Sequence, residues 1–209
     1  MMTRSIPTVF IVDDNPSVRR SLERLVRSAG FRAETFASGK EFLARKSHDG
    51  PSCAVLDVRM PGLSGMDLQK ELIREGIPLP VIFITGHGNI PMSVEAMKGG
   101  AVDFLPKPFS DKDLLAAIDR AVDKDARARE EEAEKAGIRK RLAALTPREH
   151  DVMLHVIAGM LNKQIAARLN IAEKTVKVHR GRVMQKMQAV SVAELVRMTQ
   201  RCGITPPEK

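Results

Sequence analysis

The chain has 209 residues, of which 43% are hydrophobic and 29% are charged, and its formal net charge at pH 7 is +8. This length suits one large domain or two small ones, each able to bury a core. The longest apolar runs, which end near Val12 and Thr85, are too short to span a membrane, and no signal-peptide segment precedes them, so we expect a cytoplasmic protein without membrane contact.

The positive charge is concentrated in the last third of the chain. Residues 1–122 contain 16 Lys and Arg against 15 Asp and Glu, residues 123–145 contain 7 against 6, and residues 146–209 contain 11 against 5. The three net charges are therefore +1, +1 and +6. A basic excess of this kind favours contact with nucleic acid, although many basic faces are merely solvated.

Up to about residue 122, short β-branched segments alternate with segments of helical period. The apolar segments predict five strands, at residues 8–12, 31–36, 53–57, 80–85 and 102–105. The amphipathic segments predict five helices, at residues 17–28, 39–46, 66–75, 90–98 and 111–122. Five βα units predict an α/β domain over residues 1–122, a flavodoxin-like, doubly wound, five-stranded parallel sheet.

Residues 123–143 form a predicted linker. They are rich in Ala, Glu, Lys and Arg, which predicts a semi-rigid helix that continues the preceding one until Gly137 interrupts it. The charges of this segment are interpreted as a solvated helix surface rather than a binding site.

From residue 144 onward every signal is helical. Thr146, Pro147 and Glu149 supply an N-cap, a first-position proline and a capping-box glutamate, and Gly159 ends the helix that they begin. Asn162 is predicted to cap a second short helix. A turn at residues 170–171 then leads to a third helix at 174–187 and a fourth at 192–199, which predicts an all-α helix-turn-helix domain of four helices over residues 144–209.

Polar side chains follow four of the predicted strands. Asp13 and Asp14 follow the first strand, Asp57 ends the third, Thr85 ends the fourth, and Lys107 follows the fifth. Each of these residues alone also fits an ordinary cap, turn or surface charge. Because parallel strands end at one edge of their sheet, where ligands gather, the coincidence favours a shared site.

A shared cation would explain why carboxylates are placed together there. Mg²⁺ prefers oxygen ligands and keeps several waters, so Asp14 is predicted to bind Mg²⁺ directly and Asp13 to orient a metal-bound water. Asp57 is predicted to be a ligand and also the nucleophile that forms an aspartyl phosphate. Mg²⁺ and Lys107 would neutralise the phosphoryl charge, and Thr85 would donate a hydrogen bond to a phosphoryl oxygen.

Sequence blocks around these residues resemble the receiver domain of response regulators: VDDN, VLDVRMPGLSG, FITGHG and AVDFLPKPF. The segment from LTPREHDVML to GRVMQKM resembles the LuxR-type helix-turn-helix, and the pairing is similar to the FixJ/NarL family, in its FixJ-like branch. The resemblance implies that Asp57 accepts a phosphoryl group from a sensor histidine kinase and that Arg59 offers its backbone carbonyl to Mg²⁺. It implies a regulator that binds double-stranded promoter DNA, with RNA polymerase as a further partner, and not an enzyme beyond autophosphatase activity.

Two other classes of protein are weighed against this interpretation. A phosphatase of the haloacid-dehalogenase type also forms an aspartyl phosphate on Mg²⁺, but it needs an acid two residues after the nucleophile, where this chain has Arg59. A DNA-binding protein with a degenerate receiver would not need the acidic pair, Thr85 and Lys107, all of which are present.

The third helix of the C-terminal domain is the candidate recognition helix. In the major groove its Lys and Arg side chains would contact phosphates, and its Thr, Val and Gln side chains would reach base edges or methyl groups. Gly181 stands where relatives often place a longer side chain, and Ala172 where they usually have a Ser cap. The candidate DNA contacts are Lys174, Thr175, Lys177, Val178, Gly181, Arg182 and Gln185, with Lys163 of the second helix placed for a backbone phosphate.

A switch mechanism follows from two side chains. A phosphate on Asp57 would attract the Thr85 hydroxyl and open space beneath the loop at residues 86–88. Phe104 resembles the family's aromatic switch position and would rotate into that space, although it fits an ordinary strand phenylalanine equally well. The face around Val94, Met97 and Lys98 would then change shape and form a homodimer on phosphorylation.

Overall fold

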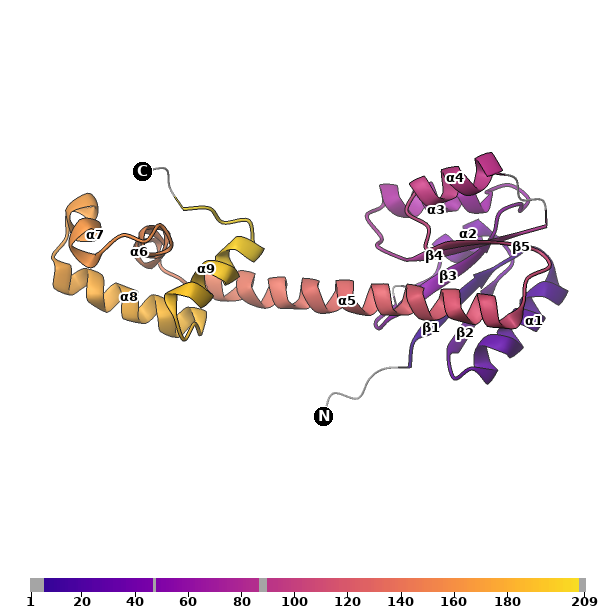
Figure 1. Ribbon diagram of the computed structural model, residues 1–209, viewed down its shortest axis with the longest axis horizontal. Coiled ribbons are helices and arrows are strands. Elements are labelled where there is room, and N and C mark those ends of the chain that lie inside the picture. The colour runs from indigo at the N-terminus through magenta and orange to yellow at the C-terminus, as the bar shows by residue number, and fades with distance from the viewer. Residues whose placement is uncertain (1–5, 47, 87–89, 207–209) are drawn as a thin grey trace. The chain divides into compact units, whose positions relative to one another are not determined.

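The computed structural model of the protein describes residues 6–46, 48–86 and 90–206. The chain divides into two compact units, Met1–Arg129 and Glu130–Lys209 (Figure 1). Within the described ranges, no helix is both long enough and apolar enough to cross a membrane.

The N-terminal unit is built on a five-stranded parallel sheet in the order β2-β1-β3-β4-β5, which confirms the predicted doubly wound α/β fold. The strands are β1 (Thr8–Val12), β2 (Arg32–Phe36), β3 (Ser52–Asp57), β4 (Val81–Thr85) and β5 (Asp103–Pro106). The helices are α1 (Pro16–Ser28), α2 (Gly39–Leu43), α3 (Gly65–Arg74), α4 (Ile90–Lys98) and α5 (Asp111–Ala143). The register pairs Val12 of β1 with Leu56 of β3, so the ends of these two central strands lie side by side.

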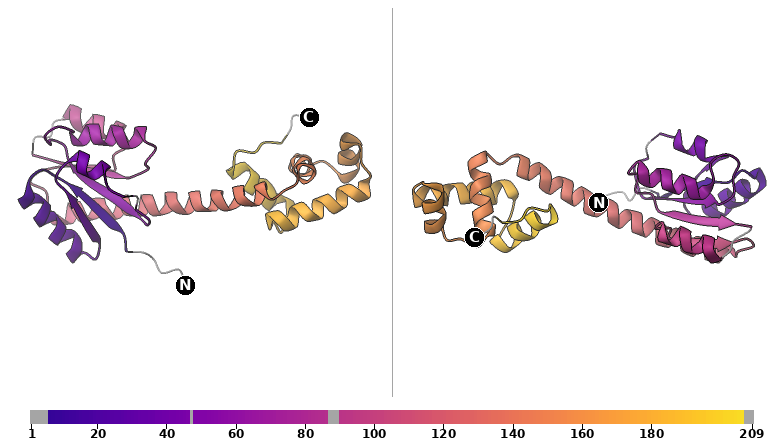
Figure 2. Two further views of the ribbon diagram at one scale, coloured as in Figure 1. Left: turned by 180° about the vertical axis from the view of Figure 1, so that it is seen from behind. Right: turned by 90° about the horizontal axis from the view of Figure 1, so that it is seen from above.

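Helices cover both faces of this sheet (Figures 1 and 2). On one face, Val9 and Ile11 of β1 pack in a core with α1 and α5. On the other, Phe10 and Val12 pack in a core with α2, α3 and α4. Because successive side chains of a strand point to opposite faces, a strand covered on both sides is mostly apolar, as residues 9–12 of β1 are.

Helix α5 is longer than the sequence predicts, because it continues through Gly137 to Ala143. The predicted interruption at Gly137 is therefore wrong. Glycine within a helix costs about 1 kcal/mol relative to alanine. The next residue, Ile138, is 1% exposed and belongs to the core of the C-terminal unit, so burial of its side chain offsets that cost.

The C-terminal unit adds four helices after α5: α6 (Pro147–Ile157), α7 (Asn162–Leu169), α8 (Glu173–Met187) and α9 (Val192–Arg201). Thr146 and Glu149 form the predicted capping box at the start of α6. Asn170 ends α7 in the left-handed conformation, at φ 51°, and makes the tight turn between α7 and α8. Val176, Val183 and Met187 of α8 are fully buried in the core.

The predicted cap of α7 is wrong. Asn162 is the first helical residue rather than the N-cap, which is Leu161. The side-chain oxygen of Asn162 accepts a hydrogen bond from the Arg180 guanidinium at 3.1 Å and is not available to the helix start. Gln164 accepts from the Leu161 backbone N–H at 2.8 Å instead, so that N–H is satisfied by a side chain three residues later.

An ion pair between a buried carboxylate and a partly exposed lysine joins α6 to α8. The Glu149 carboxylate is 2% exposed and accepts hydrogen bonds from Lys186 Nζ at 2.6 Å and from the Thr146 backbone N–H at 2.9 Å. The Lys186 contact is the largest cause that lowers the pKa of Glu149, to about 2 from an ordinary value of 4.5.

This pair predicts a pH-dependent stability of the C-terminal unit. Between pH 2 and 5 the unfolded chain binds more protons at Glu149 than the folded chain, so the stabilisation is complete above the ordinary pKa and is lost as pH falls toward about 2. Glu149→Gln should remove roughly 2–3 kcal/mol of unfolding free energy at neutral pH and flatten its acid dependence. Hydrogen exchange of the Val152 and Met187 backbone amides in the full chain measures the unfolding free energy and its pH dependence. Glu131→Gln, an exposed control, should change neither quantity.

Candidate functional site

Three of the predicted site residues meet at the carboxyl edge of the sheet. Asp13 follows β1, Asp57 ends β3, and Lys107 follows β5. The Lys107 ammonium contacts Asp13 Oδ2 at 2.9 Å and Asp57 Oδ1 at 2.8 Å. Asp13 is 1% exposed and Asp57 is 7% exposed, so the ammonium is shared between two buried carboxylates.

Backbone groups fix the other oxygen of each carboxylate. Asp13 Oδ1 accepts a hydrogen bond from the Asn15 N–H at 2.8 Å, and Asn15 is in turn the N-cap of α1. Asp57 Oδ2 accepts from the Arg59 N–H at 2.8 Å. Buried carboxylates are tolerated only when they are paired and hydrogen-bonded, and here all four oxygens have a donor.

The charges of the site influence one another. Burial raises the pKa of the Asp57 carboxyl, and the neighbouring Asp13 carboxylate acts in the same direction, while Lys107 opposes both; the net shift is upward. Burial alone would lower the pKa of Lys107, but its contacts with Asp57 and Asp13 outweigh burial and raise it. Lys107 therefore remains a cation, and Asp57 lies in a setting where an additional positive charge would stabilise its ionised form.

The predicted convergence of three carboxylates is only partly present. Asp14 lies at the bend where the chain leaves β1 and is exposed, whereas Asp13 is buried. No group of three or more His, Cys, Asp or Glu side chains in the described ranges is arranged to hold a metal ion. The structure thus brings together two carboxylates and an ammonium.

Mg²⁺ nevertheless suits the residues that are present. This ion is usually held by one or two carboxylates together with waters and phosphate oxygens, rather than by a complete protein cage. Asp13 and Asp57 already direct one oxygen each toward a single cationic group. The donor set at this edge, two buried carboxylates beside the Arg59 backbone, is chemically suited to a hard cation.

The predicted switch residues lie next to this cluster. Thr85 is 1% exposed, and its carbonyl accepts a hydrogen bond from the Lys107 N–H at 2.7 Å. Phe104 is half-buried and packs against the core, with its ring centroid 6.4 Å from that of Phe83. Of the loop at residues 86–88, His87 and Gly88 lie outside the described residues, so the expected opening of space beneath this loop stays a prediction.

Gly65 is a site residue that sequence reasoning missed. It begins α3, and a Cβ there would lie 2.2 Å from the Asp57 carbonyl oxygen. No real side chain tolerates that distance, so glycine is required for α3 to start directly against the end of β3. The signal in the sequence was a second glycine, three residues after Gly62 in the segment that follows Asp57.

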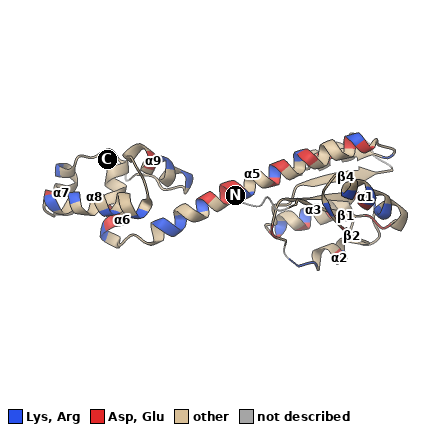
Figure 3. Ribbon diagram, turned by 90° about the horizontal axis from the view of Figure 1, so that it is seen from below, with Lys and Arg blue, Asp and Glu red and all other residues tan. Residues whose placement is uncertain are grey.

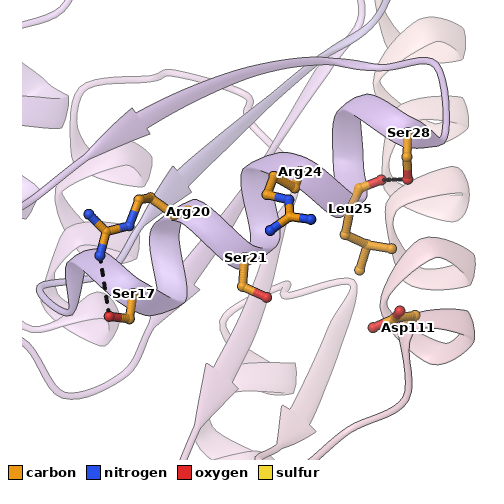
Figure 4. Close-up of a pocket in the computed structure, with 7 residues that line it drawn as sticks. All are labelled: Ser17, Arg20, Ser21, Arg24, Leu25, Ser28 and Asp111. Atoms are coloured by element: carbon orange, nitrogen blue, oxygen red, sulfur yellow. Dashed lines mark hydrogen bonds between the residues drawn. The ribbon is translucent and has the colours of Figure 1, made fainter.

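An open groove lies on α1, which starts three residues after Asp13. Its cavity has a volume of about 670 Å³. Figure 4 shows Arg20 and Arg24 along the exposed side of α1, with Asp111 at the start of α5 across from Ser28. The guanidinium of Arg20 donates to Ser17 Oγ at 3.5 Å, while the groove itself faces solvent.

In the C-terminal unit, the structure exposes every predicted DNA-contacting residue. Figure 3 shows Lys and Arg along α7 and α8. Val178 is 47% exposed, whereas Val176 and Val183 of the same helix are fully buried. The exposed candidates are Lys163 on α7 and Lys174, Thr175, Lys177, Val178, Gly181, Arg182 and Gln185 on α8.

Two details of α8 bear on how it would read DNA. Its N-cap is Ala172, and the cap position makes no side-chain hydrogen bond. A Cβ at Gly181 would meet no heavy atom within 4 Å, so packing within the described chain does not require glycine there. Arg180, which sequence reasoning did not single out, is held by Asn162 and ties α8 to the start of α7.

A receiver-type acidic site on one unit and an exposed basic helix on another define a two-component response regulator that binds DNA. Comparison with known families supports both halves. The family "Response regulator receiver domain" matches residues 9–119, and the family "Bacterial regulatory proteins, luxR family" matches residues 143–199.

Individual relatives match along nearly the whole chain. Nodulation protein W of Bradyrhizobium diazoefficiens is 52% identical over 94% of this chain and 87% of its own length. The transcriptional regulatory protein FixJ of the same organism is 44% identical over 94% of this chain and 96% of its own. The solved structure of the response regulator StyR is 46% identical and matches 94% of this chain and 100% of its own, with a TM-score of 0.86.

The chain belongs to the response regulators of the LuxR/FixJ type. It is therefore a transcriptional regulator that binds DNA through its C-terminal domain under the control of phosphorylation of its receiver.

Proposed function

We propose that Asp57 is the phosphoacceptor and that a sensor histidine kinase in the cytoplasm supplies the phosphoryl group. The observation that supports this most strongly is Lys107, whose ammonium lies 2.8 Å from Asp57 Oδ1 and 2.9 Å from Asp13 Oδ2. A cation shared by two buried carboxylates is placed where charge develops when a carboxylate attacks phosphorus.

The transfer forms one bond and breaks another. An oxygen of Asp57 attacks the phosphorus of a phosphohistidine on the kinase, the P–N bond breaks, and its electron pair stays on the histidine nitrogen. Lys107 balances the charge of the phosphoryl oxygens, and the Thr85 hydroxyl donates a hydrogen bond to one of them. Water attack on the same phosphorus would break its bond to the Asp57 oxygen, release inorganic phosphate and regenerate the Asp57 carboxylate. This autophosphatase reaction is the only enzymatic activity we assign.

Mg²⁺ is the proposed cofactor. Asp13, Asp14 and Asp57 would hold it through their carboxylates or bound waters, with the backbone carbonyl of Arg59 as a further ligand. The ion would neutralise negative charge at the phosphoryl group. Asp13, already fixed by the Asn15 N–H and by Lys107, would keep its place as the ion binds.

The groove on α1 is the proposed docking surface for the kinase. Its first lining residue, Ser17, lies three residues after Asp14, so a helix or loop seated there would bring its phosphohistidine toward the edge of the sheet that holds Asp57. Arg20 and Arg24 would meet acidic side chains of that partner.

The proposed output is a homodimer on promoter DNA. Val94 and Met97 of α4 are 45% and 48% exposed, and with Lys98 they form the proposed dimer face. Thr85 and Phe104 would carry the signal to this face by the switch mechanism described above. We assign residues 1–122 to the receiver domain, 123–143 to a helical linker and 144–209 to the DNA-binding domain, with RNA polymerase as a further partner.

The proposed DNA contacts predict a strong salt dependence. Lys177→Ala on α8 and Lys163→Ala on α7 should each weaken binding about threefold to tenfold and reduce the slope of log affinity against log salt by about 1, since each releases one counterion fewer. Lys163→Ala should weaken all duplexes almost equally. Fluorescence anisotropy with the full chain measures both effects, and Lys112→Ala on α5 is the matched control. Affinity that stays constant across the salt titration would contradict the electrostatic basis of binding.

A further inference from the structure

A second cavity lies at the edge of the receiver sheet opposite the acidic site. Its volume is about 330 Å³, and Ser52, the first residue of β3, lines it, whereas Asp57 is the last residue of the same strand. Phe10 and Leu79 provide apolar wall, and Arg45, His48 and Arg129 provide polar groups. No acidic residue lines this cavity in the part of the chain that the structure describes.

Arg45 gives the cavity a desolvated positive charge. Its guanidinium carbon lies 3.8 Å from the ring centroid of Phe42 and 5.0 Å from that of Phe10, so the two rings hold the side chain in place. Burial lowers the pKa of Arg45, and the Glu34 carboxylate only partly opposes this. The Nε atom of Arg45 is buried and has no hydrogen-bond partner among the described residues. The Nη1 atom of Arg45 donates to the Phe42 carbonyl oxygen at 3.0 Å, and an anion in the cavity would further stabilise the charged guanidinium.

His48 lies against the same ring system. Its imidazole packs edge-on to Phe10, with the ring centroids 5.5 Å apart, and its Nε2 atom is buried without a partner that the described chain supplies. Unsatisfied buried polar atoms are uncommon in folded proteins, and both of these atoms belong to side chains that line this cavity.

An ion pair with Asp125 holds Arg129 at the cavity. The Asp125 carboxylate is 2% exposed and accepts hydrogen bonds from the Ser52 backbone N–H at 2.8 Å and from Arg129 Nε at 2.7 Å. This contact uses Nε and leaves the two terminal amino groups of the guanidinium, for which the described residues show no further bond. Those two amino groups can donate a bidentate pair of hydrogen bonds to a carboxylate, which is the geometry that Arg favours.

We propose that this cavity binds an organic anion with an apolar body, of the aryl carboxylate class. Its carboxylate would accept hydrogen bonds from Arg45 and Arg129, and its ring would lie against Phe10 and Leu79. The volume is at the lower end of the range for small-molecule sites, which suits one ring and not a nucleotide. An anion bound there would connect the segment after α2 to Arg129, the last residue of the N-terminal unit. Its binding would regulate the receiver independently of phosphorylation.

A titration of the full chain with 4-fluorobenzoate, followed by ¹⁹F NMR, tests the proposal. We expect saturable binding with a Kd on the order of 1 mM, and at least tenfold weaker binding of the neutral amide, 4-fluorobenzamide. Amide signals of Ser52 and Leu79 should shift, and those of Asp57 and Thr85 should not. Arg129→Gln and Arg45→Gln should each weaken binding about tenfold, and Arg27→Gln, on α1, should leave it unchanged.

Four results would overturn the proposal. Equal binding of the benzamide would show an apolar crevice without selectivity for anions. Displacement of 4-fluorobenzoate by an equal concentration of inorganic phosphate would show a simple anion site. In Arg129→Gln, Asp125 would still accept a hydrogen bond from the Ser52 N–H and so hold α5 to β3. Unchanged binding in this variant would show that Arg129 does not contact the anion. Absence of saturable binding at about 10 mM would exclude the site itself.

Discussion

Replacing Asp57 with Asn is expected to abolish phosphoryl incorporation from acetyl phosphate in the presence of Mg²⁺. Asp57 is the carboxylate that contacts Lys107 from the end of β3, and an amide in its place cannot attack phosphorus. Intact-mass measurement should show one added phosphoryl group on the wild-type chain and none on the variant. Removal of Mg²⁺ by a chelator should also reduce incorporation on the wild-type chain, because the ion would no longer neutralise the negative charge of the phosphoryl group.

The control for this experiment is another aspartate of the same unit. Asp119 is exposed on α5 and lies outside the site, so Asp119→Asn should incorporate a phosphoryl group like the wild type. Undiminished labelling of Asp57→Asn would reject the assignment and direct attention to Asp13 or Asp14. The circular dichroism spectrum of the variant should match that of the wild type, since Asn can still accept from the Arg59 N–H.

Addition of beryllofluoride, a mimic of the phosphoryl group, is expected to convert the full chain from monomer to dimer. The proposed dimer face presents Val94 and Met97 to solvent, and the exposed side chain of Ile90 extends the same apolar surface of α4. Burial of this surface in a symmetric contact would supply the driving force. Sedimentation velocity should show at least a tenfold increase in the association constant when beryllofluoride and Mg²⁺ are present.

Val94→Asp should prevent this dimerisation by placing a carboxylate in the contact. Ile73 is 60% exposed on α3 and provides the matched control, because Ile73→Asp introduces the same charge at another exposed apolar position. Ile73→Asp should still dimerise. A chain that remains monomeric with beryllofluoride, at concentrations that saturate DNA binding, would contradict the dimer mechanism.

The sequence predicted the strands and most of the receiver site because their signals are local. Each apolar strand is followed by the residue that carries chemistry, so the positions of Asp13, Asp57 and Lys107 along the chain determine their meeting at one edge. The two-carboxylate, one-ammonium geometry could not be predicted, because the pattern does not show which of two adjacent aspartates is buried. Exposure of Asp14 depends on the direction in which the chain leaves β1.

The errors arose where tertiary contacts override local preference. Gly137 is a helix breaker by composition, yet burial of Ile138 carries α5 through it. Asn162 has the side chain of a cap, yet Arg180 of α8 binds its oxygen from eighteen residues away. The close approach of Gly65 to the Asp57 carbonyl likewise depends on the packing of α3 against β3, which no single stretch of sequence shows.

The central claim, that phosphorylation of Asp57 controls DNA binding by α8, is tested most directly by DNA capture. Wild-type chain and Asp57→Asn would each be incubated with fragmented genomic DNA, with and without acetyl phosphate and Mg²⁺. We predict that phosphorylated wild type enriches, at least tenfold over the other three conditions, sites that contain two half-sites about one helical turn apart. Equal recovery of the same sites in all four conditions would contradict the account.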